Sequence, residues 1–266
     1  MDVESQAQAA LQLFMTPRRL PPRDWESGLQ RQGKPLTFAN GLAATVFGEG
    51  PRVLLAHGWE GRGMNLGKFI APLTASGYQA IALDGPAHGA SPGEQTNPVN
   101  YARAMVAVGR ELGPLAGVIA HSMGAASTAL ALQQGLDAAK AVLIAGPSSI
   151  SGVLERFAQL TRLPEPAAER FYQLVADYVG IPADELEIAR VAADLRTPAL
   201  IIHDAGDTEV PFADGLAVAT NWPASRFFVT KGLGHRRILL DSGVIAMSVS
   251  FITADAPSAA LLGSIA

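Results

Sequence analysis

Cysteine is absent from the 266-residue sequence. This absence excludes disulfide bonds, a cysteine nucleophile and cysteine-ligated metals, although it does not indicate a redox compartment. Charge is also sparse: 20 lysine and arginine residues stand against 24 aspartate and glutamate residues, which gives a net charge of −4. Because no block of like charge is present, the sequence predicts neither a nucleic-acid-binding surface nor a membrane-binding one.

Targeting signals are missing from the amino-terminal sequence. Residues 1–4 include the acidic Asp2 and Glu4 where a signal peptide would be basic, and no apolar core of a signal peptide follows them. Residues 112–136 carry no formal charge, a length that could span a bilayer, but they include a proline, a histidine and four glycines. A buried strand that runs into a buried helix explains this stretch better than a membrane span. We therefore expect a cytoplasmic protein, and the sequence leaves its oligomeric state open.

Short apolar runs that alternate with helical segments dominate the chain. The runs lie at residues 53–56, 80–83, 118–120, 141–145, 199–202 and 227–229. Runs this short and this continuously apolar are typical of parallel strands that are buried on both faces. Their alternation with helices predicts an α/β fold with a mainly parallel, doubly wound sheet.

Two local patterns add detail to this fold. A helix is predicted after Asn97, a candidate N-cap that precedes Pro98, because apolar residues recur there at helical spacing: Tyr101, Met105, Val108 and Leu112. Residues 36–38 and 43–47 flank Ala39-Asn40-Gly41. This arrangement predicts an antiparallel hairpin at the edge of the sheet.

Residues 147–196 break the alternation, because they contain no strand pattern. Two apolar sets at helical spacing occupy them: Val153, Leu154, Phe157 and Leu160, then Phe171, Leu174, Val175 and Tyr178. We interpret this segment as a helical cap inserted into an α/β core made of residues 1–146 and 197–266. The alternative is a set of further helices packed on a face of the sheet. The small, apolar tail at residues 257–266 is predicted to be disordered.

A serine follows the third of the main apolar runs, in Ala120-His121-Ser122-Met123-Gly124. This pattern resembles the nucleophile elbow of the α/β hydrolases, G-x-S-x-G, with Ala120 in place of the first glycine. In such an elbow a strand turns sharply into a helix and exposes the serine hydroxyl above the sheet. The alternative is a serine that only caps a buried helix.

The resemblance to α/β hydrolases extends to an acid and a base. Asp207 stands before Val210-Pro211 as the family's catalytic acid does, and His235 follows a glycine in a loop after the last apolar run. The family order of serine, acid and histidine makes His235 the base and Asp207 the residue that orients it. Asp204 is the competing acid, but the family pattern has a glycine at that position.

The same resemblance implies an oxyanion hole and a substrate pocket. The backbone N–H groups of Trp59 and Met123 would bind the oxyanion, because the sequence from His57 to Trp59 resembles the family's H-G-x loop. Trp59, His121 and Phe157 are candidate pocket residues, although the Trp59 ring could instead pack beneath the cap. We expect the nearby side chains of Glu60 and Arg62 to be solvated or paired with each other.

Three further patterns concern a structural turn, metals and cofactors. Residues 84–91 match the family's D-x-P-x-H-G-x-S turn, in which we expect Asp84 and His88 to be hydrogen-bonding struts. The five histidines lack the paired spacing of metal ligands, so no metal is predicted. A lysine after Gly67 and the glycines near residue 60 do not fit phosphate-binding or dinucleotide-binding motifs, so no cofactor is predicted.

These patterns together predict a serine hydrolase that cleaves a small carboxylic ester through an acyl-enzyme on Ser122. Its only predicted partner is the small-molecule ester substrate. The same triad could instead serve an amidase or peptidase, a lactonase, a carbon–carbon bond hydrolase or a perhydrolase. A non-catalytic protein of the same fold that binds a small molecule is the alternative from another class.

Overall fold

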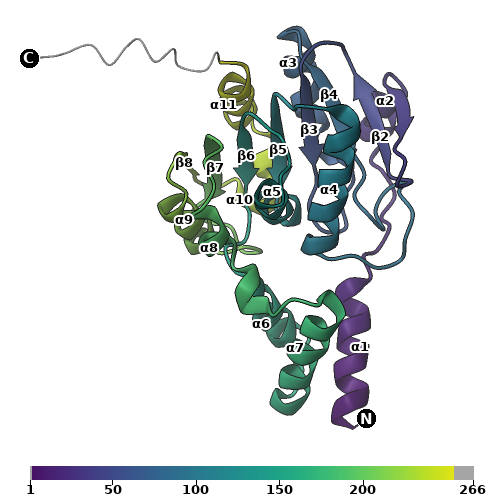
Figure 1. The fold of residues 1–266 in the computed structure, drawn as a ribbon, viewed down its shortest axis with the longest axis vertical. Helices are drawn as coiled ribbons and strands as arrows, with labels where there is room; N and C mark the ends of the chain where they lie inside the picture. Colours follow the sequence, from purple (N-terminus) through teal and green to yellow (C-terminus); the bar gives the residue numbers. More distant parts are fainter. Residues whose placement is uncertain (1, 255–266) are drawn as a thin grey trace, which may run out of the picture.

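The computed structural model describes residues 2–254 and shows a sheet with helices on both faces (Figure 1). The tail at residues 257–266 lies outside the described residues. Eight strands follow one another across the sheet in the order β1-β2-β4-β3-β5-β6-β7-β8. All pairs from β4 to β8 are parallel, whereas β1 and β2 are antiparallel to their neighbours. The predicted α/β fold with a mainly parallel sheet is therefore confirmed.

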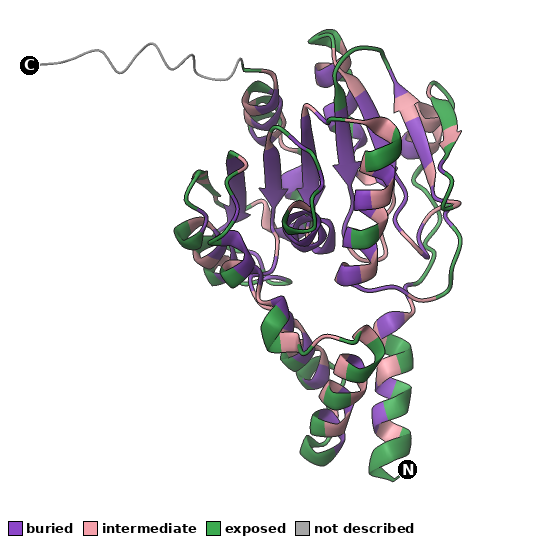
Figure 2. Ribbon diagram, viewed as in Figure 1, coloured by how far each residue is buried: buried purple, intermediate pink, exposed green. Residues whose placement is uncertain are grey.

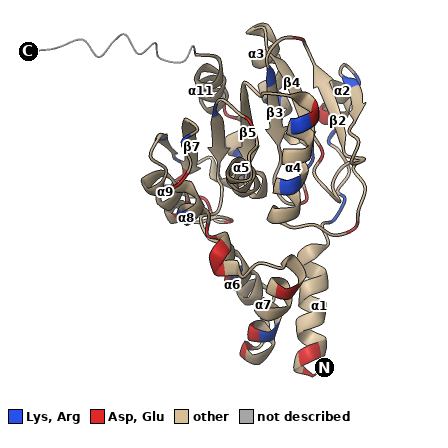
Figure 3. Cartoon of the chain, in the orientation of Figure 1, with Lys and Arg blue, Asp and Glu red and all other residues tan. Residues whose placement is uncertain are grey.

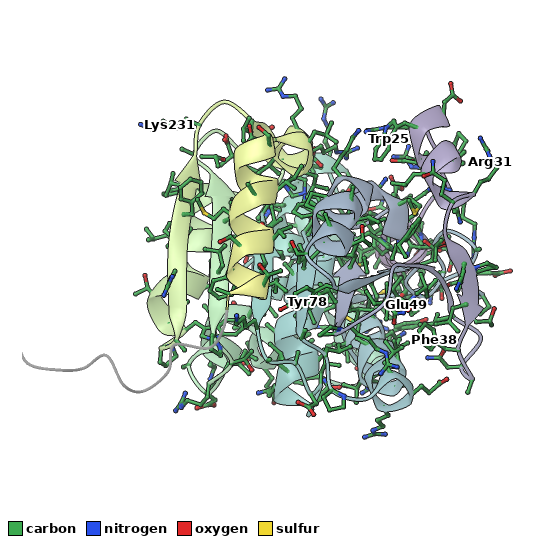
Figure 4. All side chains as sticks on the ribbon, turned by 90° about the horizontal axis from the view of Figure 1, so that it is seen from above. Trp25, Arg31, Phe38, Glu49, Tyr78 and Lys231 are labelled. Atoms are coloured by element: carbon green, nitrogen blue, oxygen red, sulfur yellow. The ribbon has the colours of Figure 1, made fainter. Side chains whose placement is uncertain are left out.

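The strand bounds agree with the apolar runs to within a few residues. The strands are β1 (Lys34–Thr37), β2 (Ala43–Phe47), β3 (Arg52–Ala56), β4 (Gln79–Leu83), β5 (Gly117–His121), β6 (Ala141–Ile144), β7 (Ala199–Asp204) and β8 (Ser225–Thr230). The predicted hairpin is present, but Phe38 lies in its turn and donates its N–H to Leu42. Figure 4 shows the two edges of the sheet, with Phe38 after β1 at one side and Lys231 after β8 at the other.

Each face of the sheet carries its own apolar core. Neighbouring strand residues point to opposite faces, so Leu54 packs in one core and Leu55 in the other. The first core is covered by α4 (Pro98–Leu112), α5 (Met123–Gln133), α8 (Ile188–Ala192) and α9 (Phe212–Asn221). The second is covered by the 3-10 helix η1 (Gly63–Phe69), α3 (Ile70–Ala75) and α11 (Ser242–Thr253). The central strands are buried on both sides (Figure 2), as their continuous apolar sequences predict.

The helix predicted after Asn97 is α4, and its capping is as expected. The Asn97 side chain accepts a hydrogen bond from the Asn100 N–H, and Pro98 is the first helical residue. The uncharged segment at residues 112–136 forms the buried strand β5 and the largely buried helix α5. None of the helices within residues 2–254 is long and apolar enough to cross a bilayer.

Three helices lie together beyond the carboxyl ends of the parallel strands (Figure 1), and we call them the three-helix lobe. They are α1 (Val3–Met15), α6 (Ile150–Leu160) and α7 (Glu165–Val179). Phe14 of α1 packs edge-on against Phe157 and Phe171, with ring centroids 5.0 and 5.6 Å apart. The apolar spacing of the sequence predicts α6 and α7, whereas α1 is not among the predicted helices. Acidic and basic residues are dispersed along α4, α6 and α7 (Figure 3).

The remaining short elements connect these layers. They are α2 (Asp24–Gln30), η2 (Ala183–Leu186), α10 (Gly234–Arg237) and η3 (Ile238–Leu240). Between α1 and α2, residues 16–23 form an extended segment without helix or strand, which we call the linking segment. It runs from the three-helix lobe back to the sheet domain, so its contacts join the two parts of the molecule.

Candidate active site

Ser122 lies at the sharp turn from β5 into α5. Its φ of 53° and ψ of −120° fall in a region that residues other than glycine rarely adopt. The turn also needs Gly124, because a Cβ atom there would come within 2.5 Å of the carbonyl oxygens of Ala56 and His57. Although Ser122 occupies the N-cap position, its side chain makes no capping hydrogen bond. The interpretation as a simple helix cap is therefore wrong.

The hydroxyl of Ser122 is joined to two other predicted site residues. His235, in α10, places Nε2 3.0 Å from the Ser122 oxygen Oγ. Its other ring nitrogen, Nδ1, lies 2.7 Å from Oδ2 of Asp207. Because Nδ1 faces a carboxylate it carries the proton, which leaves Nε2 to accept a hydrogen bond from the serine. The structure thus brings Ser122, His235 and Asp207 into one hydrogen-bonded chain.

Asp207 is buried, and several donors stabilise its charge. Its Oδ1 accepts hydrogen bonds from the N–H groups of Glu209 and Val210, at 2.8 and 3.0 Å. Its Oδ2 lies 3.5 Å from Nε2 of His203, a neighbour that the sequence analysis did not identify. Burial opposes the charge, but hydrogen bonds from His203, His235 and Val210 outweigh it and hold the pKa of Asp207 well below its ordinary value. The carboxylate therefore stays ionised beside His235.

Asp204, the competing acid, has a different set of contacts. Its Oδ2 accepts hydrogen bonds from the Thr230 hydroxyl at 2.7 Å and from the Leu233 N–H at 3.0 Å. Its Oδ1 accepts one from the Gly206 N–H at 2.9 Å. These contacts join the end of β7 to the end of β8 and to the loop that leads to His235. Asp204 thus holds this loop in place, and the carboxylate that faces the imidazole is that of Asp207.

His121 contacts the backbone of His235. Its Nε2 lies 2.8 Å from the His235 carbonyl oxygen, and the two ring centroids are 4.7 Å apart. Burial, followed by the proximity of His235, lowers the pKa of His121 to about 3. The neutral ring therefore donates from Nε2 and fixes the position of His235. The sequence places His121 beside the serine, but no local pattern indicates this contact across 114 residues of chain.

The loop after β3 carries Trp59, which lines the same two cavities as Ser122. Glu60 has a φ of 55°, and its N–H donates to Nε2 of His88 at 3.0 Å. The Trp59 ring packs edge-on against His88, with centroids 5.5 Å apart. None of these contacts uses the backbone N–H of Trp59. Met123 is the first residue of α5, a position where the backbone N–H has no acceptor within the helix.

The predicted struts of residues 84–91 hold this loop. Asp84 accepts hydrogen bonds from the N–H groups of Gly63 at 2.8 Å and Ala90 at 2.9 Å, and its carbonyl accepts one from the Ser91 hydroxyl. His88 accepts from Glu60 on one ring nitrogen and contacts the Pro86 carbonyl with the other. The prediction that Asp84 and His88 are structural struts is confirmed.

Glu60 and Arg62 differ from the expectation that they pair with each other or with solvent. The Glu60 carboxylate, which is largely buried, accepts hydrogen bonds from Nε and Nη2 of Arg18, both at 2.6 Å. Hydrogen bonding from Arg18 is the main reason that the pKa of Glu60 is lowered. Arg62 donates to the carbonyl of Leu20. Both side chains therefore attach the linking segment to the loop that carries Trp59, an arrangement that local sequence does not reveal.

Two cavities meet at Ser122, and both are also lined by Trp59 and Glu209. The apolar cavity, of about 280 Å³, lies between the three-helix lobe and the strand ends. Its apolar lining includes Leu13, Phe14, Val153, Phe157, Val175 and Val179. The polar cavity, of about 210 Å³, is lined by residues that include Arg23, Glu26, Glu60, Arg62, His121 and Arg236. The three predicted pocket residues are thus divided: Phe157 lines the first cavity, His121 the second and Trp59 both.

The histidines of the site do not form a metal centre with their acidic neighbours among the described residues. Within residues 2–254, no group of three or more histidine, aspartate or glutamate side chains is arranged to hold a metal ion. The histidines at the strand ends instead make hydrogen bonds to backbone groups. His57 contacts the Gly58 carbonyl through Nδ1 and accepts from the Gly85 N–H through Nε2. The side chains that meet at Ser122 offer a hydroxyl, an imidazole and a carboxylate.

Comparisons with known proteins agree with the fold. The model of the alpha/beta hydrolase family matches residues 53–246. An esterase from Pyrococcus furiosus has a TM-score of 0.68 at 19% identity, and the match covers 89% of this chain and 98% of that one. An esterase from Exiguobacterium antarcticum is also similar in fold, with a TM-score of 0.63 at 18% identity, and the match covers 84% of this chain and 100% of that one. A bromoperoxidase from Bacillus anthracis has a TM-score of 0.64 at 17% identity, and the match covers 82% of this chain and 99% of that one. A search of curated protein sequences gives no match.

Proposed function

The chain belongs to the alpha/beta hydrolase family, and from that premise we propose that it is a serine hydrolase acting on small carboxylic esters. The observation that carries the proposal is the chain of hydrogen bonds from Asp207 through His235 to Ser122. Esterases among the similar structures support an ester as the substrate. The strained backbone of Ser122 supports a role as nucleophile, because strain of this kind is concentrated at functional sites.

In the proposed reaction, Ser122 Oγ attacks the ester carbonyl carbon while His235 Nε2 takes the hydroxyl proton. Asp207 stabilises the resulting imidazolium and keeps its Nδ1 proton in place. The N–H groups of Trp59 and Met123 bind the oxyanion, and each donor contributes roughly 10²–10³ in rate. The proton then passes from His235 to the leaving alcohol. Water repeats the cycle and hydrolyses the acyl-enzyme, so the reaction uses no cofactor.

The two cavities supply the two halves of the proposed substrate site. The acyl chain enters the apolar cavity, where Phe14 and Phe157 line the wall. The alcohol occupies the polar cavity, from which it can leave into water. In this proposal the three-helix lobe is the cap of the site, with α1 contributing to it alongside the predicted segment 147–196. Burial of each methylene of the acyl chain then contributes about 0.8 kcal/mol to binding.

The test is covalent labelling with a fluorophosphonate, which reacts with activated serines. We expect one adduct per chain by intact-mass measurement in wild type and none in Ser122→Ala. Ser76→Ala, which changes an exposed serine at the end of α3, is the matched control and should label as wild type does. Labelling that persists in Ser122→Ala, or no labelling of folded wild type, would overturn the proposal and favour a binding protein.

Labelling tests the activated serine and not the bond that it cleaves. Amides, lactones, carbon–carbon bonds and perhydrolysis of carboxylic acids would use the same serine. Rates on matched esters and amides with the same acyl group separate the ester proposal from these alternatives. A higher kcat/KM on the amide would contradict the choice of an ester.

A further inference from the structure

Gly58 brings the backbone of the loop after β3 against the candidate nucleophile. A Cβ atom built on Gly58 would lie 2.9 Å from Ser122 Cβ and 3.0 Å from His121 Nδ1, which is too close for a side chain. The peptide group that joins Gly58 to Trp59 thus starts beside the serine. No hydrogen bond of the described residues uses the N–H of this peptide group, which is that of Trp59. The direction of this free N–H depends on what holds the rest of the peptide group.

The carbonyl of the same peptide group is held by two partners. The Gly58 oxygen lies 2.7 Å from Nδ1 of His57, and it accepts a hydrogen bond from the Gly61 N–H at 3.1 Å. A trans peptide group is planar, and its C=O and N–H bonds point in opposite directions. Whatever fixes the Gly58 oxygen therefore also fixes the direction of the Trp59 N–H.

The tautomer of His57 makes this side chain a donor to Gly58. Its Nε2 accepts a hydrogen bond from the Gly85 N–H at 2.9 Å, so the ring proton resides on Nδ1. The ring is buried, and Tyr101 packs against it with centroids 5.5 Å apart. Burial, followed by the proximity of His88, lowers the pKa of His57 to about 3. The imidazole therefore stays neutral near neutral pH and keeps both hydrogen bonds.

The backbone that follows Trp59 is held in a similar way. The Glu60 N–H donates to Nε2 of His88, at 3.0 Å. His88 is buried too, and its ring lies against that of His57 with centroids 4.9 Å apart. An oxyanion donor is effective when it is fixed before the reaction, because it then needs no reorganisation as the charge develops. The Trp59 N–H meets this condition, since the groups on both sides of it have buried partners.

We propose that His57 is a positioning residue, whose hydrogen bond to the Gly58 carbonyl aims the Trp59 N–H at the oxyanion that forms on the substrate. In this role the histidine touches no substrate and transfers no proton. The two ring nitrogens then differ in importance: Nδ1 acts on the oxyanion donor, whereas Nε2 joins the loop to Gly85. This inference rests on the proposed function, because the oxyanion forms only when Ser122 attacks a carbonyl group.

Two amide variants separate the two ring nitrogens. The side-chain nitrogen of asparagine lies as many bonds from Cα as His57 Nδ1, and the amide group of glutamine lies as many bonds away as Nε2. His57→Asn therefore keeps a donor to Gly58, whereas His57→Gln keeps an acceptor for the Gly85 N–H and places its donor away from Gly58. We expect kcat to fall roughly 30-fold in His57→Gln, with KM little changed, and by less than about threefold in His57→Asn. Each variant loses one buried hydrogen bond, so their urea midpoints should fall by similar amounts.

Thionoesters show whether the loss of kcat arises at the oxyanion. Sulfur in place of the carbonyl oxygen is a weak acceptor, so an oxyanion donor assists a thionoester less than it assists the matched ester. The ratio of kcat/KM for the ester to that for the thionoester should fall about tenfold in His57→Gln and stay near the wild-type value in His57→Asn. Ser248→Ala, which removes a buried hydrogen bond within α11, is the matched control and should keep the wild-type ratio. An unchanged ratio in His57→Gln would overturn the inference and leave the proposed function intact.

A measurement on wild type does not need either variant to fold. ¹⁵N NMR of the imidazole should show the His57 proton on Nδ1, with no change between about pH 8 and about pH 5. A proton on Nε2 would overturn the inference, because Nδ1 could then not donate to Gly58. Absence of fluorophosphonate labelling at Ser122 would instead overturn the proposed function, and the inference with it.

Discussion

The apolar and polar cavities share Ser122 but are built from different kinds of residue. The apolar cavity is lined largely by side chains of α1, α6 and α7, such as Phe14, Phe157 and Val175. The polar cavity is lined by short segments around α2, the loop after β3 and the region after His235. Helical walls of apolar side chains can discriminate ligands by length and shape. Loops with polar groups can discriminate them by hydrogen bonding.

Charge in the polar cavity is largely offset within the protein. Glu60 binds Arg18 at 2.6 Å, and Arg236 binds Glu209 at 2.9 Å. Paired charges attract a charged ligand only weakly, because each charge is offset by its partner. The polar cavity therefore presents hydrogen-bonding groups with little net field. The difference between the cavities thus lies in hydrogen-bonding groups more than in net charge.

The largest expected loss of activity comes from changing Asp207, the acid on which hydrolysis depends whichever cavity holds the longer part of the substrate. Asp207→Asn takes away the charge that keeps the proton on His235 Nδ1, so we expect kcat to fall by about 10⁴ for short and long acyl esters alike. Asp204→Asn is the matched control, because its contacts hold the loop instead. It should cost about 1–3 kcal/mol of stability, measured by urea unfolding, with a much smaller loss of kcat. Equal losses of kcat in the two variants would contradict the assignment of Asp207.

Acid should lower the stability of the fold through two buried histidines near the carboxyl ends of the strands, His57 and His121. Burial lowers the pKa of His57 and His121 to about 3. Below about pH 6.5 the unfolded chain takes up protons that the folded chain does not, so stability falls as the pH drops toward 3. When the pH is lowered from about 7.5 to about 5, we expect each of these two histidines to lower the free energy of unfolding by about 2 kcal/mol. His57→Gln, which keeps a donor and an acceptor, should make this loss about 2 kcal/mol smaller; an unchanged loss would contradict this explanation.

The sequence predicts the sheet and the turn at Ser122 well, because their causes are local. Continuous apolar runs indicate strands buried on both faces, and Gly124 marks the close contact that the turn requires. Strand β8 extends beyond its apolar run at residues 227–229, because an edge strand is buried less completely. The candidate site follows from these strands, since parallel strands end at one side of the sheet.

The parts that the sequence does not predict depend on contacts between distant segments. Asp2 and the spacing of Ala7, Ala10 and Phe14 could have indicated α1, but no local pattern shows that Phe14 packs against Phe171. The same holds for the pairing of Arg18 with Glu60 across 42 residues. Whether residues 147–196 act as a cap stays a prediction, although the structure shows that α1 lies with them in the three-helix lobe.

Filling the apolar cavity should distinguish its role in binding the substrate from that of the polar cavity. Val153 lines the apolar cavity from α6 and is half-buried, so Val153→Trp should occupy the space of about three methylenes. At about 0.8 kcal/mol for each methylene, kcat/KM for an octanoyl ester should fall by roughly 50-fold relative to an acetyl ester of the same alcohol. Acetyl esters of increasingly long alcohols are the control series, and their relative rates should not change. A loss confined to the long alcohols would reverse the assignment of the two cavities.

The smallest expected effect concerns the paired charges of the polar cavity. Arg18→Gln leaves the Glu60 carboxylate without its partner, and because Glu60 is only 18% exposed this charge would face the cavity and little solvent. At low salt we expect KM to fall roughly threefold for an ester with a cationic alcohol and to rise by a similar factor for an anionic one. Arg170→Gln breaks the Arg170–Glu4 pair on the outside of the three-helix lobe and should leave both KM values unchanged. If the two substrates respond alike to Arg18→Gln, Glu60 affects the loop that carries Trp59 rather than the charge of the cavity, because a field must distinguish the sign of a substrate whereas a displaced loop does not.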